Sequence, residues 1–433
     1  NYLSRFLSSY NIYPFGAFQK RRLGKEHGKL SYAVIGDAFV DVLAPGVKDL
    51  PKWNSDSLAA SPVALHPGGS ALNTAVHLRE LCGQKVCLHT ALGNDDFGSF
   101  LIAALQRRGL DLVNHYTSEK KKGKKNDVSR FLSSGRKNSF CLKKKHEEST
   151  IARADAEIGT GACLVISGPN DRAFVTHRGV INALSIKCAQ TVAQGVSHLH
   201  IAGYYNCPCL QADVPELLRA ARLNGATTSM GVQHDYSGCW SGIGKAPLLV
   251  QNNSAGCAPD FLILSEDEAR SIVLNLRGDS LKAHALDAEQ DATTLLTRGA
   301  AVLAVVITVG AKGAIAAARR YPGSRLIIVK QQAAPISPEA FVDATGAGDA
   351  FAAGFIAGIH CLSSWNEADP SPRSLRRALI LGCAAGASCV SNLGASAPLL
   401  QENLRANITA LYKLNEQLSS DLPDLMFHLD ASK

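Results

Sequence analysis

Apolar stretches of strand length alternate with stretches of helical character along most of the chain. Short apolar runs predict strands at residues 32–35, 86–92, 199–202, 228–232, 261–264 and 304–308. Helices are expected at residues 71–82, 96–107 and near 212–223. Because strands that alternate with helices form mostly parallel sheets covered on both faces, this pattern predicts an α/β fold.

A second pattern interrupts this alternation in two places. Residues 162–167 and 173–176 are apolar and flank the turn sequence Gly168-Pro169-Asn170-Asp171, which predicts a hairpin. Residues 38–65 are irregular and contain short apolar stretches. We therefore expect two segments, about 37–68 and 160–180, to form a small sheet separate from the main one.

The charge of the chain is concentrated in one segment of an otherwise ordinary globular composition. Hydrophobic residues make up 46% and charged residues 19% of the 433 positions, enough for a sizeable core. The net charge is +8, yet residues 119–145 alone hold 11 Lys and Arg against 2 Asp and Glu. The remainder holds 34 basic and 35 acidic residues, which argues against a broadly basic nucleic-acid-binding protein.

Two segments do not fit the alternating pattern. Residues 117–150 are rich in Lys and Ser without a sustained hydrophobic period, so we expect a disordered basic insertion. Residues 1–30 form an N-terminal extension that is similar to the end of an organelle transit peptide but fits a disordered basic tail equally well. The expected compartment is the cytoplasm, or a plastid or mitochondrion if the extension is a transit peptide. The hexapeptide SRFLSS occurs in both segments, at 4–9 and 129–134, and is too short to be a structural repeat.

Neither a membrane span nor a cysteine framework is visible in the sequence. No apolar run reaches the roughly 18–20 residues of a transmembrane helix, so no membrane partner is expected. The 12 cysteines are mostly isolated, and the close pair Cys207 and Cys209 lacks a second pair or His cluster at zinc-site spacing. We interpret them as buried or free thiols in a reducing compartment.

The strongest chemical signal is the glycine-rich segment Asp343-Ala-Thr-Gly-Ala-Gly-Asp349, which precedes an Ala- and Gly-rich stretch expected to be helical. The first backbone N–H groups of a helix lack partners within it, and the helix dipole favours anions there. Because Gly346, Ala347 and Gly348 are small, a phosphate could approach these groups closely. Asp349 would lie beside this anion hole and could accept a proton from a hydroxyl while the hole holds a phosphoryl group.

Two other phosphate-binding motifs do not fit this segment. A dinucleotide-binding fingerprint needs a third glycine where Phe351 stands, and it belongs on the first strand of its domain. A Walker loop needs Gly-Lys-Ser/Thr preceded by another glycine, which the sequences at 244–246 and 312–313 do not provide.

With these motifs, the sequence resembles the ribokinase-like, or PfkB, family of carbohydrate and nucleoside kinases. The C-terminal signature of that family corresponds to residues 343–356, and its N-terminal signature to Gly68-Gly69-Ser-Ala-Leu-Asn73-Thr-Ala75. The motifs have the expected order and separation, and the resemblance covers roughly residues 31–398. It implies a three-layer α-β-α kinase domain at 31–433, with a mostly parallel central sheet and a small β-sheet lid.

The resemblance also implies roles for individual residues. Asp349 matches the catalytic base, and the anion hole corresponds to Gly346, Ala347 and Gly348. Substrate-contacting positions correspond to Asp41, Gly68, Gly69, Asn73 and Arg178. The ATP-contacting positions correspond to Ser265, Thr308, Gly310 and Gly313. Glu268 matches a glutamate linked to magnesium through water, and Asp343 and Thr345 match positions that help hold a monovalent cation.

The chain departs from the family pattern at three places. Ser265 stands where the family has the Asn of an Asn-x-x-Glu motif, which weakens the polar contact expected there. Ala344 replaces the usual Thr of the C-terminal signature. The segment 231–235 lacks the acidic residue expected at its start. None of these changes affects Asp349 or the anion hole.

These features favour an ATP-dependent kinase that moves the γ-phosphoryl group of ATP to a hydroxyl of a small sugar, with ATP, Mg²⁺ and an optional K⁺ as cofactors. A nucleoside kinase is the second candidate, because Phe39 and Trp53 are available to stack on a base. A non-catalytic scaffold protein of the same family is the third. A homodimer formed through the lid is the expected protein partner, and nucleic acid is not expected.

Overall fold

The computed structural model describes residues 30–116, 158–168, 172–243, 258–278, 287–320, 324–361 and 371–415. The expected N-terminal extension, the basic insertion and both copies of the repeated hexapeptide lie outside these residues.

The larger sheet has the strand order β13-β12-β11-β10-β9-β8-β1-β4-β5. Its strands are β1 (Ser31–Gly36), β4 (Lys85–Thr90), β5 (Asp111–Asn114), β8 (His198–Ala202), β9 (Thr227–Gly231), β10 (Phe261–Ser265), β11 (Ala304–Thr308), β12 (Ala314–Ala318) and β13 (Ile327–Gln331). The strands from β5 to β11 run parallel, whereas β12 runs antiparallel to both of its neighbours, β11 and β13. The six strands expected from apolar runs all belong to this sheet, with ends that differ by at most two residues.

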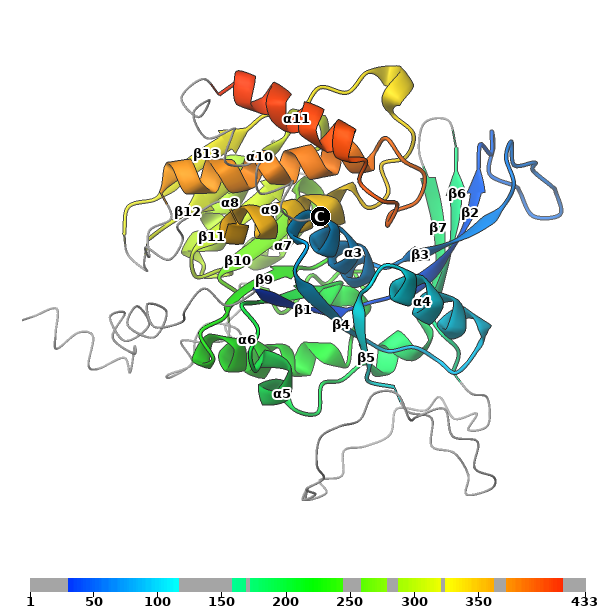
Figure 1. Cartoon of the computed structure of the whole chain (residues 1–433), viewed down its shortest axis with the longest axis horizontal. Helices are drawn as coiled ribbons and strands as arrows, with labels where there is room; N and C mark the ends of the chain where they lie inside the picture. Colours follow the sequence, from blue (N-terminus) through cyan, green and yellow to red (C-terminus); the bar gives the residue numbers. More distant parts are fainter. Residues whose placement is uncertain are drawn as a thin grey trace, which may run out of the picture.

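Helices cover both faces of this sheet (Figure 1). One face packs on α3 (Ser70–Cys82), α4 (Asp96–Arg107), α9 (Ala347–Cys361), α10 (Pro372–Cys389) and α11 (Gln401–Lys413). The other packs on α5 (Ala189–Ala193), α6 (Val214–Leu223), α7 (Glu266–Arg277) and α8 (Ala288–Thr297). Along β1, Tyr32 and Val34 join the first core and Ala33 and Ile35 the second, because side chains alternate across a strand.

The smaller sheet has the order β3-β2-β6-β7 and stands at one end of the molecule (Figure 1). Its strands are β2 (Phe39–Pro45), β3 (Ala64–Gly68), β6 (Ala162–Ser167) and β7 (Arg172–His177). The expected three-layer fold with a second small sheet is therefore confirmed. We call this smaller sheet the lid. Short 3₁₀ helices occupy Gly179–Ala183, Tyr204–Asn206, Leu210–Ala212, Gly310–Lys312 and Pro338–Ala340.

The order of the strands fixes where a ligand can bind. From β1 the chain moves outward to β4 and β5, and it then returns to β8 on the opposite side of β1. Ligands of open α/β sheets bind at such a switch point, outside the carboxyl ends of the strands. This edge carries Asp37 after β1 and Gly203 after β8. In the described part of the chain, no helix is both long and apolar enough to cross a membrane.

Candidate active site

Asp349 lies in the first turn of α9 and is fixed by the first turn of α3. Its Oδ1 accepts a hydrogen bond from Ser70 Oγ at 2.6 Å, and its Oδ2 accepts one from Asn73 Nδ2 at 2.8 Å. Ser70 and Asn73 are three residues apart and therefore share one face of α3. The two signatures, whose contacting residues are 276 and 279 positions apart in sequence, thus meet on one buried carboxylate.

Gln233 is a third donor to this carboxylate, and the sequence pattern does not predict it. Its Nε2 lies 3.0 Å from Ser70 Oγ and 3.4 Å from Asp349 Oδ1. The backbone of Gln233 has φ +63°, a conformation that costs a non-glycine residue free energy and that often occurs at functional sites. No local motif marks this conformation.

Burial makes several carboxyl groups of the site weaker acids. Burial raises the pKa of Asp349 to about 6, against the opposing effect of its bonds from Ser70 and Asn73. Burial and the charge of Asp37 raise the pKa of Asp41 to about 7. Burial likewise raises the pKa of Glu268 to about 7. A carboxylate with a pKa near the working pH can accept a proton and release it again.

These pKa values predict an acid limb in the pH profile of catalysis. If Asp349 acts as the base, its proton must leave before turnover, so kcat/KM for the acceptor should rise with pH and level off above about pH 6–7. Asp41 and Glu268 titrate in the same range and share that limb. Initial rates between pH 5 and 8.5 measure it. A flat profile over this range would exclude a rate-determining role for Asp349 ionisation.

The expected anion hole lies at the turn into α9. Gly346 has φ +82°, and a Cβ on it would lie 2.4 Å from the carbonyl oxygen of Ala395, so only glycine fits. Gly348 is exposed, and a Cβ there would meet nothing within 4 Å. The N–H of Ala347 bonds the carbonyl of Ala344 at 3.3 Å. The turn therefore presents an open surface at Gly348, backed by the chain at Ala395.

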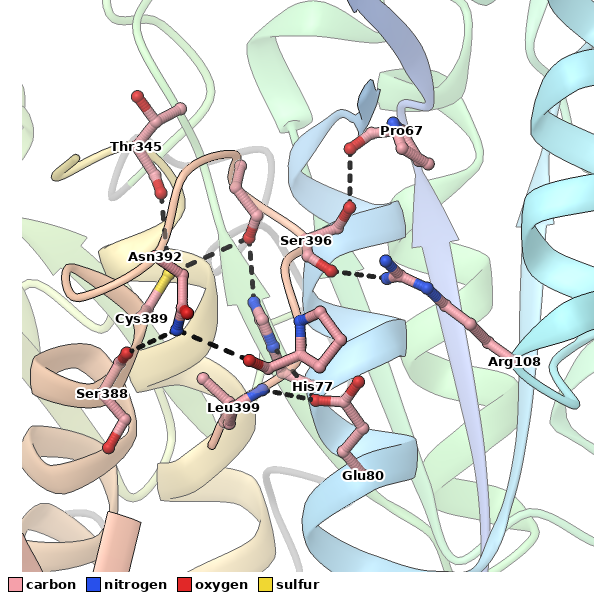
Figure 2. Close-up of polar contacts among 12 residues, drawn as sticks. Pro67, His77, Glu80, Arg108, Thr345, Ser388, Cys389, Asn392, Ser396 and Leu399 are labelled. Atoms are coloured by element: carbon pink, nitrogen blue, oxygen red, sulfur yellow. Dashed lines mark hydrogen bonds and ion pairs between the residues drawn. The ribbon is translucent and has the colours of Figure 1, made fainter. Parts of the chain in front are cut away.

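The segment behind this turn, between α10 and α11, is fastened to α3 (Figure 2). His77 Nε2 lies 2.9 Å from the carbonyl oxygen of Ala395, and Glu80 accepts a bond from the N–H of Leu399 at 3.1 Å. The thiol of Cys389 points at the carbonyl of Thr345 at 3.6 Å. The same helix thus holds both Asp349 and the segment behind the expected anion hole.

The residues expected to contact a substrate surround this turn from the lid side. Asp41 lies within β2. A Cβ on Gly68 would lie 2.1 Å from the Asp41 carboxylate, which explains the glycine. A small open hollow is lined by Asp41 and His66 on the lid and by Asp343 and Thr345 on the turn. Arg178 follows β7, and its guanidinium stacks on Tyr236 at 5.1 Å.

Asp37 is a buried carboxylate of the site to which the sequence analysis assigned no role. It accepts bonds from the N–H of Ala71 at 3.0 Å and from Asn206 Nδ2 at 2.7 Å. It therefore anchors the start of α3 at the switch point. Burial raises its pKa. The sequence feature that could have pointed to Asp37 is the Gly-Asp pair at the end of the first predicted strand.

The residues expected to contact ATP lie at the ends of β10 and β11. Ser265 caps α7 and accepts a bond from the N–H of Glu268, whose carboxylate accepts one from the N–H of Ser265. This capping box gives both residues a structural role. Thr308 ends β11, and Gly310 (φ +52°) and Gly313 (φ +105°) shape the turn that follows.

The aromatic residues considered for stacking on a base are not brought into the site. Phe39 is buried, and a Cβ on Gly161 would lie 2.4 Å from its ring. Trp53 is fully exposed. His177 is exposed at the end of β7.

The oxygen atoms around Asp343 are of the type that a hard cation accepts. Asp343 Oδ1 accepts bonds from the N–H and Oγ1 of Thr345, at 2.9 and 2.7 Å. Arg172 Nη1 lies 3.0 Å from Thr345 Oγ1 and 3.4 Å from Asp343 Oδ1, so a guanidinium already supplies positive charge to both. Among the described residues, no group of three or more His, Cys, Asp or Glu could hold a metal ion.

Fold and site together are those of a ribokinase-like protein: an open α/β sheet with a β-sheet lid, and a buried carboxylate beside a glycine-rich helix start. The profile of the pfkB family carbohydrate kinases matches residues 29–149 and 141–402. The chain belongs to this family. A search of curated protein sequences found no match.

Solved structures support the same fold at low sequence identity. Ribokinase from Giardia lamblia is 14% identical, with a TM-score of 0.61 over 88% of this chain and 99% of that one. Adenosine kinase from Sinorhizobium meliloti is 18% identical, with a TM-score of 0.57 over 90% and 99%. A double mutant of fructokinase from Vibrio cholerae, bound to fructose, ADP and potassium ion, is 19% identical, with a TM-score of 0.56 over 89% and 100%.

Proposed function

We propose that this chain is an ATP-dependent kinase that phosphorylates a hydroxyl group of a small sugar. The observation that carries the proposal is the position of Asp349. It is held by Ser70 and Asn73 and stands one residue after the open turn at Gly348. A base placed beside an anion site can take the proton of a hydroxyl while that hydroxyl attacks a phosphoryl group.

In the proposed reaction, the acceptor lies between the lid and α3. Asp41 accepts bonds from sugar hydroxyls, and Asn73 and the backbone at Gly68 and Gly69 complete the acceptor site. Asp349 removes the proton of the attacking hydroxyl. The N–H groups at 346–348 stabilise negative charge on the phosphoryl group in transfer.

The nucleotide is proposed to lie along the ends of β10 and β11, against Thr308, Gly310 and Gly313. Magnesium bound to its phosphates would neutralise their charge, with Glu268 as the nearby carboxylate that could contact it through water. Asp343 and Thr345 are the proposed contacts for a monovalent cation.

A nucleoside acceptor remains the second candidate, and its support is the likeness of the fold to an adenosine kinase. Phe39 is buried and Trp53 is exposed, so their positions give no support to a nucleoside acceptor. A scaffold role is disfavoured because the carboxylate expected to act as the base is present and is held by two donors from α3. The homodimer through the lid and the compartment stay predictions.

A phosphoryl-transfer screen tests the proposal. Purified protein with ATP and Mg²⁺ is offered free pentoses, hexoses, sugar acids and nucleosides, and ADP formation is measured for each acceptor. Sugar-dependent ADP release supports the proposal. Release with nucleosides alone would favour the second candidate, and no release with any acceptor would favour the scaffold.

Asp41→Ala tests the acceptor site directly. Loss of a buried acceptor leaves a substrate hydroxyl unpaired, so KM for the sugar should rise about 10- to 100-fold while KM for ATP changes little. Asp49→Ala is the charge-matched control, because Asp49 is exposed in the segment after β2. Equal sugar KM in the two variants would show that Asp41 does not contact the acceptor.

A further inference from the structure

Arg172 links the lid to the anion-hole turn. It is the first residue of β7, and its side chain is 27% exposed. Its Nη1 reaches both Thr345 Oγ1 and Asp343 Oδ1, at 3.0 and 3.4 Å, across more than 170 residues of sequence. Thr345 immediately precedes Gly346, whose left-handed backbone starts the turn into α9. This contact therefore joins β7 directly to the turn that starts the expected anion hole.

The geometry around Arg172 orients its guanidinium toward the site. Arg172, Phe174 and Thr176 alternate along β7 and share the face of the lid that carries Val165 and Cys163. The guanidinium lies over the Phe174 ring at 5.9 Å, a contact that favours a cation. Val175 points to the opposite face and is 65% exposed.

The three polar groups at this contact depend on one another. Asp343 is almost completely buried, with its side chain 3% exposed, and its Oδ1 holds both the N–H and the hydroxyl of Thr345. A buried carboxylate needs a compensating positive charge. Arg172 provides that charge and contacts the same hydroxyl. Arg172 therefore adds to the stability of the bond that orients the start of the hole, beside the backbone N–H groups of Thr345 and Gly394, from which Asp343 also accepts bonds.

We propose that Arg172 is a positioning residue that couples closure of the lid to formation of the anion hole. When the lid closes, the arginine completes the Asp343–Thr345 contact and sets the N–H groups of the turn. When the lid opens, Arg172 loses its contact with Asp343 and Thr345, and the N–H groups of the turn lose their fixed orientation. The phosphoryl group is then held for transfer only under a closed lid, from which water is excluded. The kinetic part of this inference rests on the proposed kinase function.

Three variants test the coupling: Arg172→Ala, Arg172→Lys and the control Val175→Thr on the other face of β7. We expect Arg172→Ala to lower kcat about 10- to 100-fold, the scale of an angstrom-sized misplacement. More ATP should be hydrolysed per sugar phosphate formed, because water reaches the site. Low millimolar guanidinium should restore part of the turnover of Arg172→Ala. The kcat of Arg172→Lys should lie between those of Arg172→Ala and the unchanged protein. The kcat of Val175→Thr should equal that of the unchanged protein.

A second measurement does not require turnover. Hydrogen–deuterium exchange reports on the amide of Thr345, which bonds Asp343 Oδ1, and on the strands β6 and β7. In Arg172→Ala both regions should exchange faster together, whereas Val175→Thr should leave the turn unchanged. If the turn exchanges normally in Arg172→Ala, the coupling is wrong even in a working kinase. If no acceptor is phosphorylated but both regions exchange faster, the proposed function fails and the structural link stands.

Discussion

Replacing Asp349 by Asn should lower kcat by about 10²- to 10⁴-fold, the contribution that a general base makes to a reaction of this kind. The amide has nearly the size of the carboxylate but cannot accept the proton of the attacking hydroxyl. It also presents an NH₂ group toward Ser70 or Asn73, both of which now donate to the carboxylate. KM for ATP should change little, because the nucleotide is proposed to lie along β10 and β11.

A coupled assay of ADP release measures the loss, and titration calorimetry with ADP checks that the nucleotide still binds. Thermal unfolding separates a chemical effect from a folding defect. Asp287→Asn is a control for the substitution itself, since Asp287 caps the exposed start of α8 on the opposite face of the sheet. An Asp349→Asn protein with nearly normal turnover would remove Asp349 from the mechanism.

The strands of the main sheet can be predicted from the sequence because they are buried on both faces. Such strands are short continuous apolar runs, which β10 and β11 display clearly. Ala314–Ala318 is different, because its composition AIAAA favours a helix by intrinsic propensity. It is strand β12 because it is paired on both sides, with β11 and β13. Tertiary pairing of that kind leaves no local signal.

The candidate site likewise contains some residues that a local sequence motif predicts and others that only the folded chain brings together. Gly346, Gly348 and Asp349 belong to one short motif, and their proximity is a property of the helix start. Arg172 and Gln233 come from distant segments, and neither is marked by a local motif. Asp41 was assigned through the resemblance to the family, but its placement in β2 depends on pairing with β3 and β6. Spacing within a motif can be predicted, whereas contacts between lid, turn and helix require the assembled fold.

Gly346→Ala is expected to have the second large effect, because this position combines a conformational and a steric requirement. A left-handed conformation costs a non-glycine residue about 1–2 kcal/mol. The added Cβ would also lie 2.4 Å from the Ala395 carbonyl oxygen and 2.7 Å from the Ala395 Cα, both backbone atoms. Because His77 also contacts that carbonyl oxygen, at 2.9 Å, the turn itself must shift. The N–H groups of the hole then point away from the phosphoryl group, and kcat should fall about 10²- to 10³-fold.

Gly278→Ala isolates the conformational part of this effect. Gly278 ends α7 with φ +73°, close to the φ of Gly346, but a Cβ there would meet nothing within 4 Å. It lies at the opposite end of α7 from Ser265, about 18 Å along the helix axis. We expect Gly278→Ala to lower the melting temperature and leave kcat unchanged, whereas Gly346→Ala lowers both. If the two variants lose stability equally and both keep full turnover, the turn at Gly346 does not shape a phosphoryl site.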